Sequence, residues 1–506
     1  MLSHVDSARL SSLLTRPLTA VFFALSLACL AVTAQPAPDC QKINQPNHVL
    51  IDATTPNPAQ ALVAALSLNY VIVELCNVDL DLTGQSIEIG DGVSLIASRD
   101  CARSPTKRGP RIFIRDRRAG GGPFVIRGDN VLFSGFRLQG PTSTIGAGDN
   151  TLERGIRISP FDSVCRDVDG RQVCEATPIC KIEISNMEFS NWSGAAIEVM
   201  DNQGVKERGR LFNTNVGAVQ IHNNYFHHNR HGDGYGYGVA VTNGSYALIE
   251  RNAFDENRHA IMGGKPSNRD PSGYTARENL ILEGGGKHCS EKWYSKVLGA
   301  LIGHSICWQT HQIDQHGNKD RLFLGDGCCG IAGETIIIER NSILYNAGKA
   351  IKIRGNPADK AVVDGNFFRH KSRSDAIAQN GDPGLWGIFG GDNINKPIDV
   401  RPNNVFGSKS LGQVNRFCDF DGDSIPDLFM ATGLNWWVYS IGVQQWYYWN
   451  TMSETLSQVQ LADFDHDGKC DVGLGPANPA VPPQKYSRNG TGPWIPFIAG
   501  NQPVVP

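Results

Sequence analysis

The 506-residue sequence has almost no net charge and no clear membrane-spanning segment, and each shortage excludes a class of protein. Lysine and arginine total 47 against 50 aspartate and glutamate residues, which leaves a formal charge of −3. The basic residues are also spread along the chain, so a nucleic-acid-binding surface is excluded. The apolar run at residues 20–32 is too short and too rich in small residues to be a good membrane span.

Long amphipathic helices are lacking as well. The chain contains 55 glycines against 21 phenylalanines and 9 tryptophans, a balance that favours many tight turns over long helices. Hydrophobic residues nevertheless make up 41% of the sequence, which is enough for a substantial core, and the length allows two or more domains. We therefore expect a β-rich protein built from short elements.

The first 34 residues have the pattern of a targeting segment. Arg9 and Arg16 precede the apolar run, and Val32-Thr33-Ala34 supplies a small-x-small cleavage site. A lipoprotein would instead be acylated at Cys29, but Ser26 stands where a leucine is usual. We predict a signal peptide at residues 1–34 and export to the periplasm, the cell surface or the medium.

The cysteines lack the paired two-residue spacing of a zinc cluster, so a metal centre built on cysteine is not expected. Of the 13 cysteines, Cys29 alone lies in the leader, and the 12 that remain are an even number in an exported chain, which predicts disulfides. The adjacent Cys328 and Cys329 are expected to bond to different partners. The pairs that we predict are Cys165–Cys174, Cys289–Cys307 and Cys418–Cys470.

A repeat of 28 residues organises the middle of the chain. Ile221-His222-Asn223-Asn224-Tyr225-Phe226 is matched by Ile249-Glu250-Arg251-Asn252-Ala253-Phe254, and Asn229-Arg230-His231 is matched by Asn257-Arg258-His259. The offset is 28 in each case (252 − 224, 259 − 231). A fixed period of this length, filled by short β-branched segments that end at Asn or Gly, is typical of a stacked β-coil.

Similar segments occur along much of the chain, and an asparagine recurs where the coil must turn. Asparagine tolerates the left-handed region of backbone conformation, and its amide can bond the turn backbone. Stacked on successive rungs, these amides would form a ladder along the axis. The asparagines concerned are Asn186, Asn224, Asn252, Asn279, Asn341 and Asn366. A short helix at residues 58–68 precedes the first strands and would cap the open sheet edge.

In rung pattern, residues 47–404 resemble the right-handed β-helix superfamily that contains pectate lyases, alginate epimerases and NosD-like periplasmic proteins. The resemblance implies an all-β fold, a right-handed parallel β-helix solenoid, which we place at residues 35–405. It carries no catalytic residues over, because the sequence contains no recognised lyase or epimerase motif.

Two acidic loops near the C-terminus repeat one pattern. Asp419-Phe420-Asp421-Gly422-Asp423-Ser424-Ile425-Pro426-Asp427 is echoed by Asp463-Phe464-Asp465-His466-Asp467-Gly468-Lys469-Cys470-Asp471. Alternating carboxylates place three oxygens on one side of a tight loop, and a fourth closes it, which suits Ca²⁺. A glutamate at the twelfth position is missing, so these loops are not EF-hands.

The loops resemble the FG-GAP (VCBS-type) repeat, which implies a small Ca²⁺-binding β module at residues 406–506. In the first loop Ser424 replaces the family's central glycine. The aromatic segments at residues 436–439 and 446–449 are expected in the core of this module, with an exposed sugar-binding platform as the alternative. The ligands that the resemblance implies are Asp419, Asp421, Asp423 and Asp427 for one ion and Asp463, Asp465, Asp467 and Asp471 for a second.

Candidate chemistry lies in the middle of the coil. Residues one period apart stack about 4.8 Å from each other in a parallel sheet, so we expect Arg230 beside Arg258 and His231 beside His259. Nearby carboxylates could turn these residues into a solvated ion-pair network instead. The glycine-rich residues 232–238, which present Tyr237, open no helix and lack the phosphate-loop pattern, so nucleotide binding is excluded.

The clean repeat breaks at residues 284–333, and such interruptions usually mark loops on the binding face of a solenoid. In an extended strand Asp314 and His316 point to one face and His311 to the other, so a turn before Ile313 is needed to bring all three together. Two histidines and a carboxylate can ligate a transition metal or act as base and acid. Further positive charge for the groove comes from Lys349, Lys352 and Arg354.

This inventory of Arg, His, Tyr and Asp matches that of β-helix enzymes acting on uronate polysaccharides, so we predict a monomeric polysaccharide lyase or C5-epimerase that acts on an acidic glycan. A glycoside hydrolase with paired carboxylates, a non-catalytic glycan-binding or surface-attachment protein and a NosD-like metal-handling protein are the alternatives. The predicted roles are Arg258 as neutraliser of the substrate carboxylate, His259 and His316 as base candidates, Tyr237 as acid and Asp314 as orienter of a histidine, with His231 and Asp233 completing the set.

Overall fold

The computed structural model describes residues 47–97, 108–117, 122–141, 152–160, 164–168, 171–175, 179–200, 219–231, 234–264, 271–290, 306–319, 327–380, 394–407, 416–478 and 480–497. All of them lie in one of the two units into which the chain divides, Cys40–Pro506. The predicted signal peptide and Asp233 lie outside the described residues. No helix in the described part of the chain is long and apolar enough to cross a membrane.

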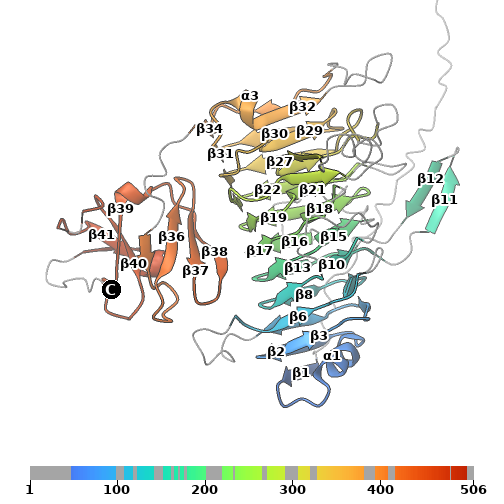
Figure 1. Cartoon of the computed structure of the whole chain (residues 1–506), viewed down its shortest axis with the longest axis horizontal. Helices are drawn as coiled ribbons and strands as arrows, with labels where there is room; N and C mark the ends of the chain where they lie inside the picture. Colours follow the sequence, from blue (N-terminus) through green and yellow to red (C-terminus); the bar gives the residue numbers. More distant parts are fainter. Residues whose placement is uncertain are drawn as a thin grey trace, which may run out of the picture. The chain divides into compact units, whose positions relative to one another are not determined.

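Three long parallel sheets of eleven, ten and nine strands wind into a coil whose rungs stack along one axis (Figure 1). Each turn visits the sheets in the same order, as β16, β17 and β18 do before β19 returns to the first sheet. The fold is therefore all-β and a parallel β-helix, as the 28-residue repeat predicts.

The strands of the three sheets are short. The eleven-stranded sheet contains β1 (Asn47–Asp52), β2 (Val71–Cys76), β5 (Ser94–Ala97), β8 (Val131–Ser134), β13 (Ile182–Ser185), β16 (Val219–His222), β19 (Tyr246–Glu250), β22 (Gly273–Arg277), β27 (Thr335–Glu339), β30 (Lys360–Asp364) and β33 (Asp399–Val400). The ten-stranded sheet contains β3 (Asp79–Asp81), β6 (Arg111–Phe113), β9 (Arg137–Gln139), β14 (Glu188–Ser190), β17 (Tyr225–His227), β20 (Ala253–Asp255), β23 (Leu280–Ile281), β28 (Ser342–Ile343), β31 (Phe367–Phe368) and β34 (Val405–Phe406). The nine-stranded sheet contains β4 (Ile87–Ile89), β7 (Phe124–Ile126), β10 (Arg154–Ile158), β15 (Ala195–Met200), β18 (Tyr237–Thr242), β21 (His259–Gly263), β26 (Ile313–Gln315), β29 (Ile351–Arg354) and β32 (Ile377–Asn380).

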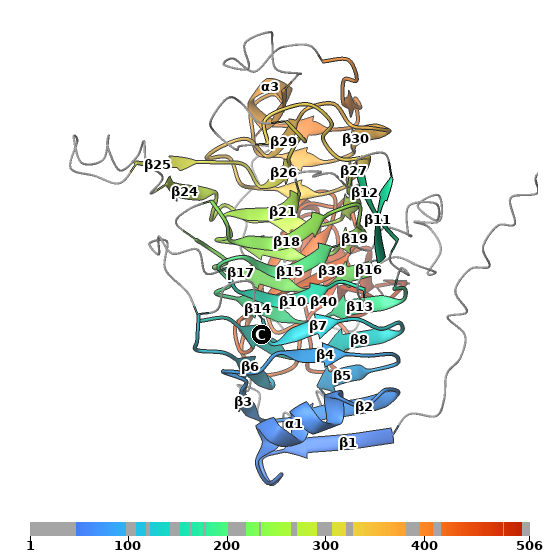
Figure 2. The same cartoon turned by 90° about the vertical axis from the view of Figure 1, so that its right-hand side faces the viewer.

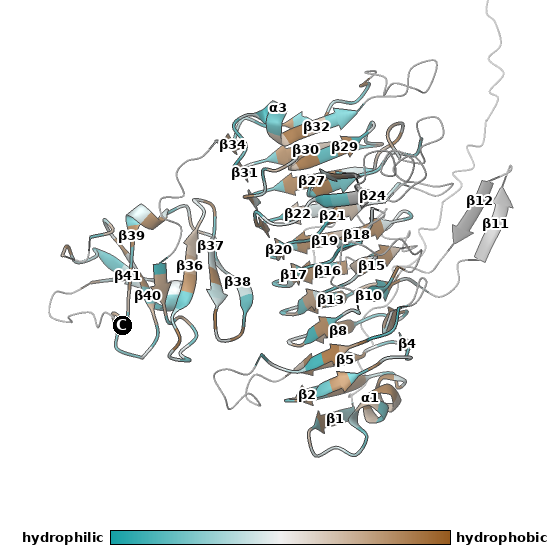
Figure 3. Ribbon diagram, viewed as in Figure 1, coloured by the Kyte–Doolittle hydropathy of each residue, from teal (hydrophilic) through white to brown (hydrophobic). Residues whose placement is uncertain are grey.

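Aliphatic and aromatic side chains from all three sheets fill the interior of the coil. Buried and partly exposed residues alternate along strands such as β2 and β16, and Figure 3 shows hydrophobic and hydrophilic residues side by side on the strands of the coil. Phe189, Phe226 and Phe254 stack on successive rungs with ring centroids 4.9 and 5.0 Å apart. Because each rung repeats the same inward positions, one column of side chains continues through the core.

A buried asparagine ladder runs between the eleven- and ten-stranded sheets. The side-chain amide of Asn224 donates to Asn252 at 3.0 Å, and Asn252 donates to Asn279 at 3.2 Å. The same bond continues from Asn279 through Asn341 and Asn366 to Asn404. The predicted ladder is thus confirmed except at Asn186, which lies one position before it, at φ 54°, where the turn requires a left-handed residue.

A short helix covers the N-terminal end of the coil. Helix α1 (Pro58–Leu66) lies against β1 and β2, and its Leu62 and Leu66 are fully buried in the core (Figure 2). Proline at the first helical turn has no N–H to leave unpaired, so it is tolerated there. The predicted cap is confirmed, and it ends two residues before the expected position 68.

The C-terminal residues form two four-stranded antiparallel sheets. One contains β35 (Arg416–Cys418), β36 (Asp427–Ala431), β37 (Trp436–Ser440) and β38 (Gln445–Asn450), and the other β39 (Val459–Ala462), β40 (Asp471–Leu474), β41 (Lys485–Ser487) and β42 (Trp494–Pro496). Each acidic loop joins the first two strands of its sheet. Trp436 and Trp437 are fully buried, so the core interpretation of this aromatic segment is correct. The remaining short elements are α3 (Arg373–Ala376), η3 (Leu456–Gln458) and η4 (Arg488–Gly490).

One of the three predicted cysteine pairs is present as a disulfide, and the backbone register is compatible with the other two. Cys418 and Cys470 form a disulfide. In the hairpins β11 (Val164–Val168) with β12 (Arg171–Glu175) and β24 (Lys287–Ser290) with β25 (Ile306–Gln309), the register sets Cys165 opposite Cys174 and Cys289 opposite Cys307, as those two predicted pairs require. The expectation for Cys328 and Cys329 was wrong, because they bond to each other. Their tight loop lies between Gly327 and Gly330, both at positive φ, which folds the chain back on itself.

Candidate functional site

A cluster of polar residues lies on the outer face of the nine-stranded sheet. Ile261, Ile313 and Ile351 pair across β21, β26 and β29 and belong to the hydrophobic core. Since side chains alternate along a strand, Asp314 and its neighbour Lys352 face away from that core. The covering segments bury Asp314 completely on this outer side.

Asp314 is the centre of the cluster. Arg354 donates to both of its oxygens, from Nε to Oδ1 at 2.8 Å and from Nη2 to Oδ2 at 2.7 Å. Nε2 of His311 lies 2.9 Å from Oδ1, and Nε2 of His316 lies 3.0 Å from Oδ2. Burial alone would raise the pKa of Asp314, but Arg354 and the two imidazoles outweigh burial and hold that pKa well below its usual range. The carboxyl group is therefore ionised.

His259 completes the ring around this carboxylate. Its Nδ1 bonds the carbonyl oxygen of His311, and its Nε2 lies 3.5 Å from Oδ2 of Asp314. The imidazole stacks between Tyr237 at 5.7 Å and the ring of His311 at 4.8 Å. Burial, followed by the charge of Arg258, lowers the pKa of His259 well below its usual value. We conclude that this imidazole is neutral at physiological pH.

Tyr237 and Arg258 form the next layer. The guanidinium of Arg258 lies 5.7 Å from the ring centroid of Tyr237, and its Nη1 is 3.4 Å from the phenol oxygen. Both side chains donate to the carbonyl oxygen of Gly234, Tyr237 at 2.9 Å. Burial raises the pKa of Tyr237, while the nearby Arg258 acts against that rise. The phenol therefore keeps its proton and has a cation beside it.

The structure brings together five of the seven predicted catalytic residues. Tyr237, Arg258, His259, Asp314 and His316 all belong to the cluster. The chain bends at Gln312, immediately before β26, so the turn that the sequence required is present and carries His311 to the same side.

The expected stacking of the repeat histidines and arginines was wrong. Tyr237, rather than His231, lies opposite His259, because residues 232–236 are inserted before β18 while β21 begins directly at His259. His231 is buried and packs edge-on against Tyr235 at 6.0 Å, outside the cluster. Arg230 pairs with Glu256 instead of stacking on Arg258. Asp233 lies outside the described residues.

Two members of the cluster were not among the seven predicted catalytic residues. Arg354 was expected to add positive charge to the groove, and His311 was considered with His316 and Asp314 as a metal ligand or as part of a base and acid. The register of β26 with β29 supplies the missing signal, since it places Lys352 beside Asp314 and Arg354 two residues further along. That register depends on the long segment between the two strands and could not be predicted from the repeat alone.

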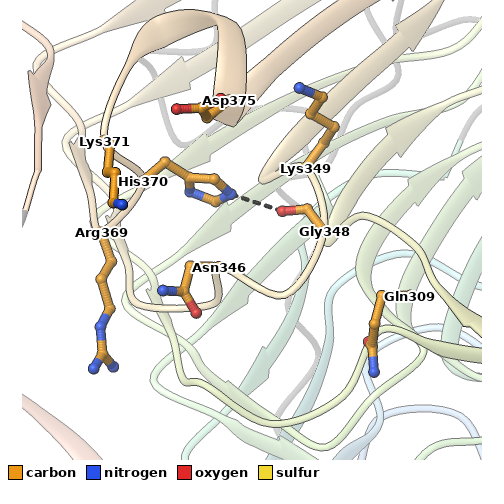
Figure 4. Close-up of a pocket in the computed structure, with 8 residues that line it drawn as sticks. All are labelled: Gln309, Asn346, Gly348, Lys349, Arg369, His370, Lys371 and Asp375. Atoms are coloured by element: carbon orange, nitrogen blue, oxygen red, sulfur yellow. Dashed lines mark hydrogen bonds between the residues drawn. The ribbon is translucent and has the colours of Figure 1, made fainter.

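A separate open pocket of about 690 Å³ is lined by residues outside the cluster (Figure 4). Its lining residue Gln309 is separated from His311 by Thr310, whose carbonyl oxygen accepts from the hydroxyl of Tyr345 at 2.7 Å. Figure 4 shows His370 directed at the carbonyl of Gly348, which its Nε2 contacts at 2.7 Å. The lining contains three basic side chains against one acidic side chain, namely Lys349, Arg369 and Lys371 against Asp375.

The two C-terminal loops gather their carboxylates in similar ways. Ligand atoms of Asp419, Asp421 and Asp427 lie within 4.8 Å of one another, and so do those of Asp463, Asp465 and Asp471. The predicted ligands Asp423 and Asp467 are not in these groups, and each accepts a backbone N–H two residues further along, from Ile425 at 2.7 Å and from Lys469 at 2.8 Å.

Several observations test whether these loops fit a cation. Among the described residues, Oδ2 of Asp423 and Oδ1 of Asp465 are buried without a hydrogen-bond partner. Burial raises the pKa of Asp427 to about 7 and that of Asp471 to about 6. Unpaired oxygens and crowded carboxylates are what a hard, oxygen-preferring cation would relieve, so the loops fit Ca²⁺.

Comparisons with known proteins add little to this picture. No protein-family model matches the chain, and no curated protein matches it. One solved structure, the crystal structure of DFA-IIIase from Arthrobacter chlorophenolicus A6 in complex with DFA-III, is 10% identical, and the match covers 71% of this chain and 94% of that one, with a TM-score of 0.21. A likeness at this TM-score supports no conclusion on fold or function, so the arguments that follow depend on the residues of this chain.

Proposed function

We propose that this chain is an exported carbohydrate-active β-helix protein that cleaves or epimerises an acidic glycan on the outer face of the nine-stranded sheet. The observation that carries the proposal is the gathering of Tyr237, Arg258, His316 and Arg354 around one buried carboxylate, that of Asp314. A second support is the pocket that Gln309, two residues before His311, helps to line, because Lys349, Lys371 and the Glu283-paired Arg369 give it the positive charge that an acidic glycan requires.

His316 is the proposed base. Around Asp314, its side chain is the most exposed imidazole, at 21% against 9% for His311 and none for His259. Because its Nε2 is buried against Asp314, Nδ1 would be the nitrogen that meets the substrate. A base removes the C5 proton of a uronate once a cation has neutralised the sugar carboxylate. Asp314 would orient the ring of His316 and stabilise the imidazolium that forms. Arg354 is the proposed neutralising cation at the exposed side, with Arg258 behind it.

Tyr237 is the proposed acid. In a lyase, the electron pair left at C5 forms a C4–C5 double bond and expels the C4 oxygen, which then takes a proton. In an epimerase, C5 itself takes a proton on the opposite face. The pKa of Tyr237 is raised by burial, so the phenol holds a proton to give, and Arg258 at 3.4 Å would stabilise the phenolate that remains.

A non-catalytic glycan-binding protein is the second candidate. The observation that favours it is the burial of the cluster. Tyr237 and Arg258 are only 6% and 5% exposed, whereas the basic pocket is open to solvent, so a glycan could reach the pocket more easily than the cluster. A glycoside hydrolase finds no support in this geometry. Arg354 holds Asp314 ionised, so this carboxyl group is a poor proton donor, and its predicted partner Asp233 lies outside the described residues.

The test compares the mature chain with two histidine variants on a panel of uronate-containing polysaccharides. His316→Gln removes the proposed base, and His222→Gln is the matched control, since His222 pairs with Glu183 at 3.2 Å on the eleven-stranded sheet. Ultraviolet-absorbing unsaturated ends report a lyase, a change in uronate composition an epimerase and reducing ends alone a hydrolase. We expect one of the first two with the wild-type chain and with His222→Gln, and a loss of at least about 100-fold with His316→Gln. Glycan binding without turnover in any assay would exclude the enzyme and leave the binding protein.

We further propose that each C-terminal acidic loop holds one Ca²⁺. Asp419, Asp421 and Asp427 would hold the first ion, and Asp463, Asp465 and Asp471 the second, since those side chains already converge. The two ions would serve the stability of the module or its attachment to a surface.

A further inference from the structure

Two imidazole nitrogens face Asp314. Nδ1 of His259 donates to the carbonyl oxygen of His311, since a carbonyl oxygen can only accept. The other ring nitrogen of His259, Nε2, lies 3.5 Å from Oδ2 of Asp314, and among the described residues it is buried without a hydrogen-bond partner. A buried nitrogen without a hydrogen bond therefore faces a carboxylate.

The second conflict is at His311. Nη2 of Arg354 lies 3.0 Å from Nε2 of His311, and a guanidinium has only protons to offer, so this nitrogen must accept. The same nitrogen lies 2.9 Å from Oδ1 of Asp314, which can also only accept. One atom cannot satisfy both neighbours with a single proton. The fully buried His259 and Asp314, together with His311, thus keep polar atoms that Arg354 does not satisfy, at a cost in free energy that a bound cation would relieve.

We propose that His259, His311 and Asp314 bind a divalent first-row transition-metal ion, with Zn²⁺ as the reference. One ring nitrogen of each histidine and one oxygen of Asp314 lie within 4.8 Å of one another, as the donor atoms of one ion must. Two imidazoles and a carboxylate are ligands of intermediate softness, which suit Zn²⁺, Fe²⁺ or Co²⁺ better than Ca²⁺. Nε2 of His316 is also buried, at 3.0 Å from Oδ2 of Asp314, where it could serve as a fourth ligand.

The neighbours of these three residues have the arrangement of an outer ligand shell. A metal-bound histidine usually donates its second ring N–H to a carbonyl oxygen, as Nδ1 of His259 does to His311. Ligating carboxylates are usually held by hydrogen bonds, as Asp314 is by Arg354. A carboxylate has about four lone-pair sites, so two bonds from Arg354 leave room for an ion. This inference does not depend on the proposed glycan chemistry, because it concerns only binding.

The test is metal binding by the mature chain after treatment with chelator and saturation of the acidic loops with Ca²⁺. Titration calorimetry with Zn²⁺ is expected to show one site per chain, and Co²⁺ is expected to give a visible absorption band of a nitrogen- and oxygen-ligated ion. His259→Gln and His311→Gln should each weaken Zn²⁺ binding at least about tenfold. His222→Gln, on another sheet, should leave it unchanged. Circular dichroism checks that each variant keeps the wild-type fold.

Two results would overturn the proposal. The first is that the wild-type chain binds neither Zn²⁺ nor Co²⁺ at one equivalent and gives no Co²⁺ absorption band. This result can be interpreted without any variant. The other is stoichiometric binding of unchanged affinity in folded His259→Gln and His311→Gln, which would locate the ion on surface histidines. In either case the three residues form a hydrogen-bonded network without metal. Since enzymatic activity is not a readout here, failure of the glycan assays leaves this result unaffected.

Discussion

Arg354 holds Asp314 with two hydrogen bonds of 2.8 and 2.7 Å at a point where the aspartate has no exposed surface. Removing one partner of a buried ion pair leaves the other charge uncompensated, at a cost of about 3–5 kcal/mol. We therefore expect Arg354→Met to lower the free energy of unfolding of the coil by that amount in urea denaturation. Arg401→Met is the control, because Arg401 pairs with Asp364 at 2.9 Å on the surface and should change stability little. Equal effects of the two variants would contradict the buried-pair account.

The asparagine ladder should contribute to stability at each rung. Asn252 accepts from the amide of Asn224 and donates to Asn279 and to the carbonyl oxygen of Ile221, so Asn252→Ala leaves several buried groups unpaired. One unpaired buried group costs about 1–3 kcal/mol, and we expect a loss in the free energy of unfolding of at least that size. Asn403→Ala, which removes an exposed amide bonded to Asp364, should be close to neutral. Urea denaturation of both variants measures the difference.

The Cys418–Cys470 and Cys328–Cys329 disulfides should differ in what they contribute. Cys418 and Cys470 are 52 residues apart, and closing a loop of that length in the unfolded chain is worth about 4 kcal/mol in the chain-entropy account. Cys328 and Cys329 are neighbours, so their bond closes almost no loop. We expect the double alanine variant at 418 and 470 to lower the melting temperature of the C-terminal module clearly. The double alanine variant at 328 and 329 should show a much smaller effect, and the reverse order in calorimetry would contradict this account.

His370 should make stability depend on pH. Burial lowers its pKa below the usual 6.5, and its Nδ1 has no hydrogen-bond partner among the described residues. In the window between the folded pKa and about 6.5, the unfolded chain binds a proton that the folded chain refuses. Stability from this group is therefore present above that window and is lost as pH falls through it. Wild type should lose more free energy of unfolding than His370→Gln between about pH 7.5 and about pH 5. Parallel curves for the two proteins would show that His370 does not titrate in this way.

Calcium should stabilise the C-terminal module through its acidic loops. With Ca²⁺ present we expect a higher melting temperature than with chelator, and Mg²⁺ should substitute poorly because it demands a more rigid octahedral site. Asp471→Asn should remove most of the Ca²⁺ effect, since Asp471 converges with Asp463 and Asp465. Asp399→Asn, at an exposed position on β33, should keep it. Scanning calorimetry with and without Ca²⁺ measures the change in melting temperature. An equal change in both variants would contradict the assignment of the acidic loops as Ca²⁺ ligands.

The sequence predicted the repeating parts of this molecule better than its irregular ones. A period of 28 residues defines the rung, and the asparagine that recurs with it marks a position that only a stacked amide fills, so the coil and its ladder could be derived. The prediction for Asn186 was displaced by one residue. The rung at residues 221–226 contains both Asn223 and Asn224, and the sequence pattern does not say which of the two points inward.

The candidate site was harder to predict because it lies where the period fails. Insertions before β18 shift Tyr237 into the place beside His259 that the 28-residue offset assigned to His231. The pairing of Arg354 with Asp314 depends on which strand follows β26 after a long excursion, and periodicity does not supply that register. The sequence could therefore predict which residue types belong to the candidate site. Their arrangement in space could be known only from the three-dimensional structure.

The release of a label from C5 of the sugar is the most direct test of the central claim. Lyases and epimerases both break the C5–H bond, whereas hydrolases and binding proteins do not, so one measurement covers both proposed reactions. The mature chain is incubated with a uronate polysaccharide deuterated at C5, and deuterium entering the solvent is followed. The account predicts steady release by the wild type and by His222→Gln, and almost none by His316→Gln. No release from any acidic glycan that the wild-type chain binds would contradict it.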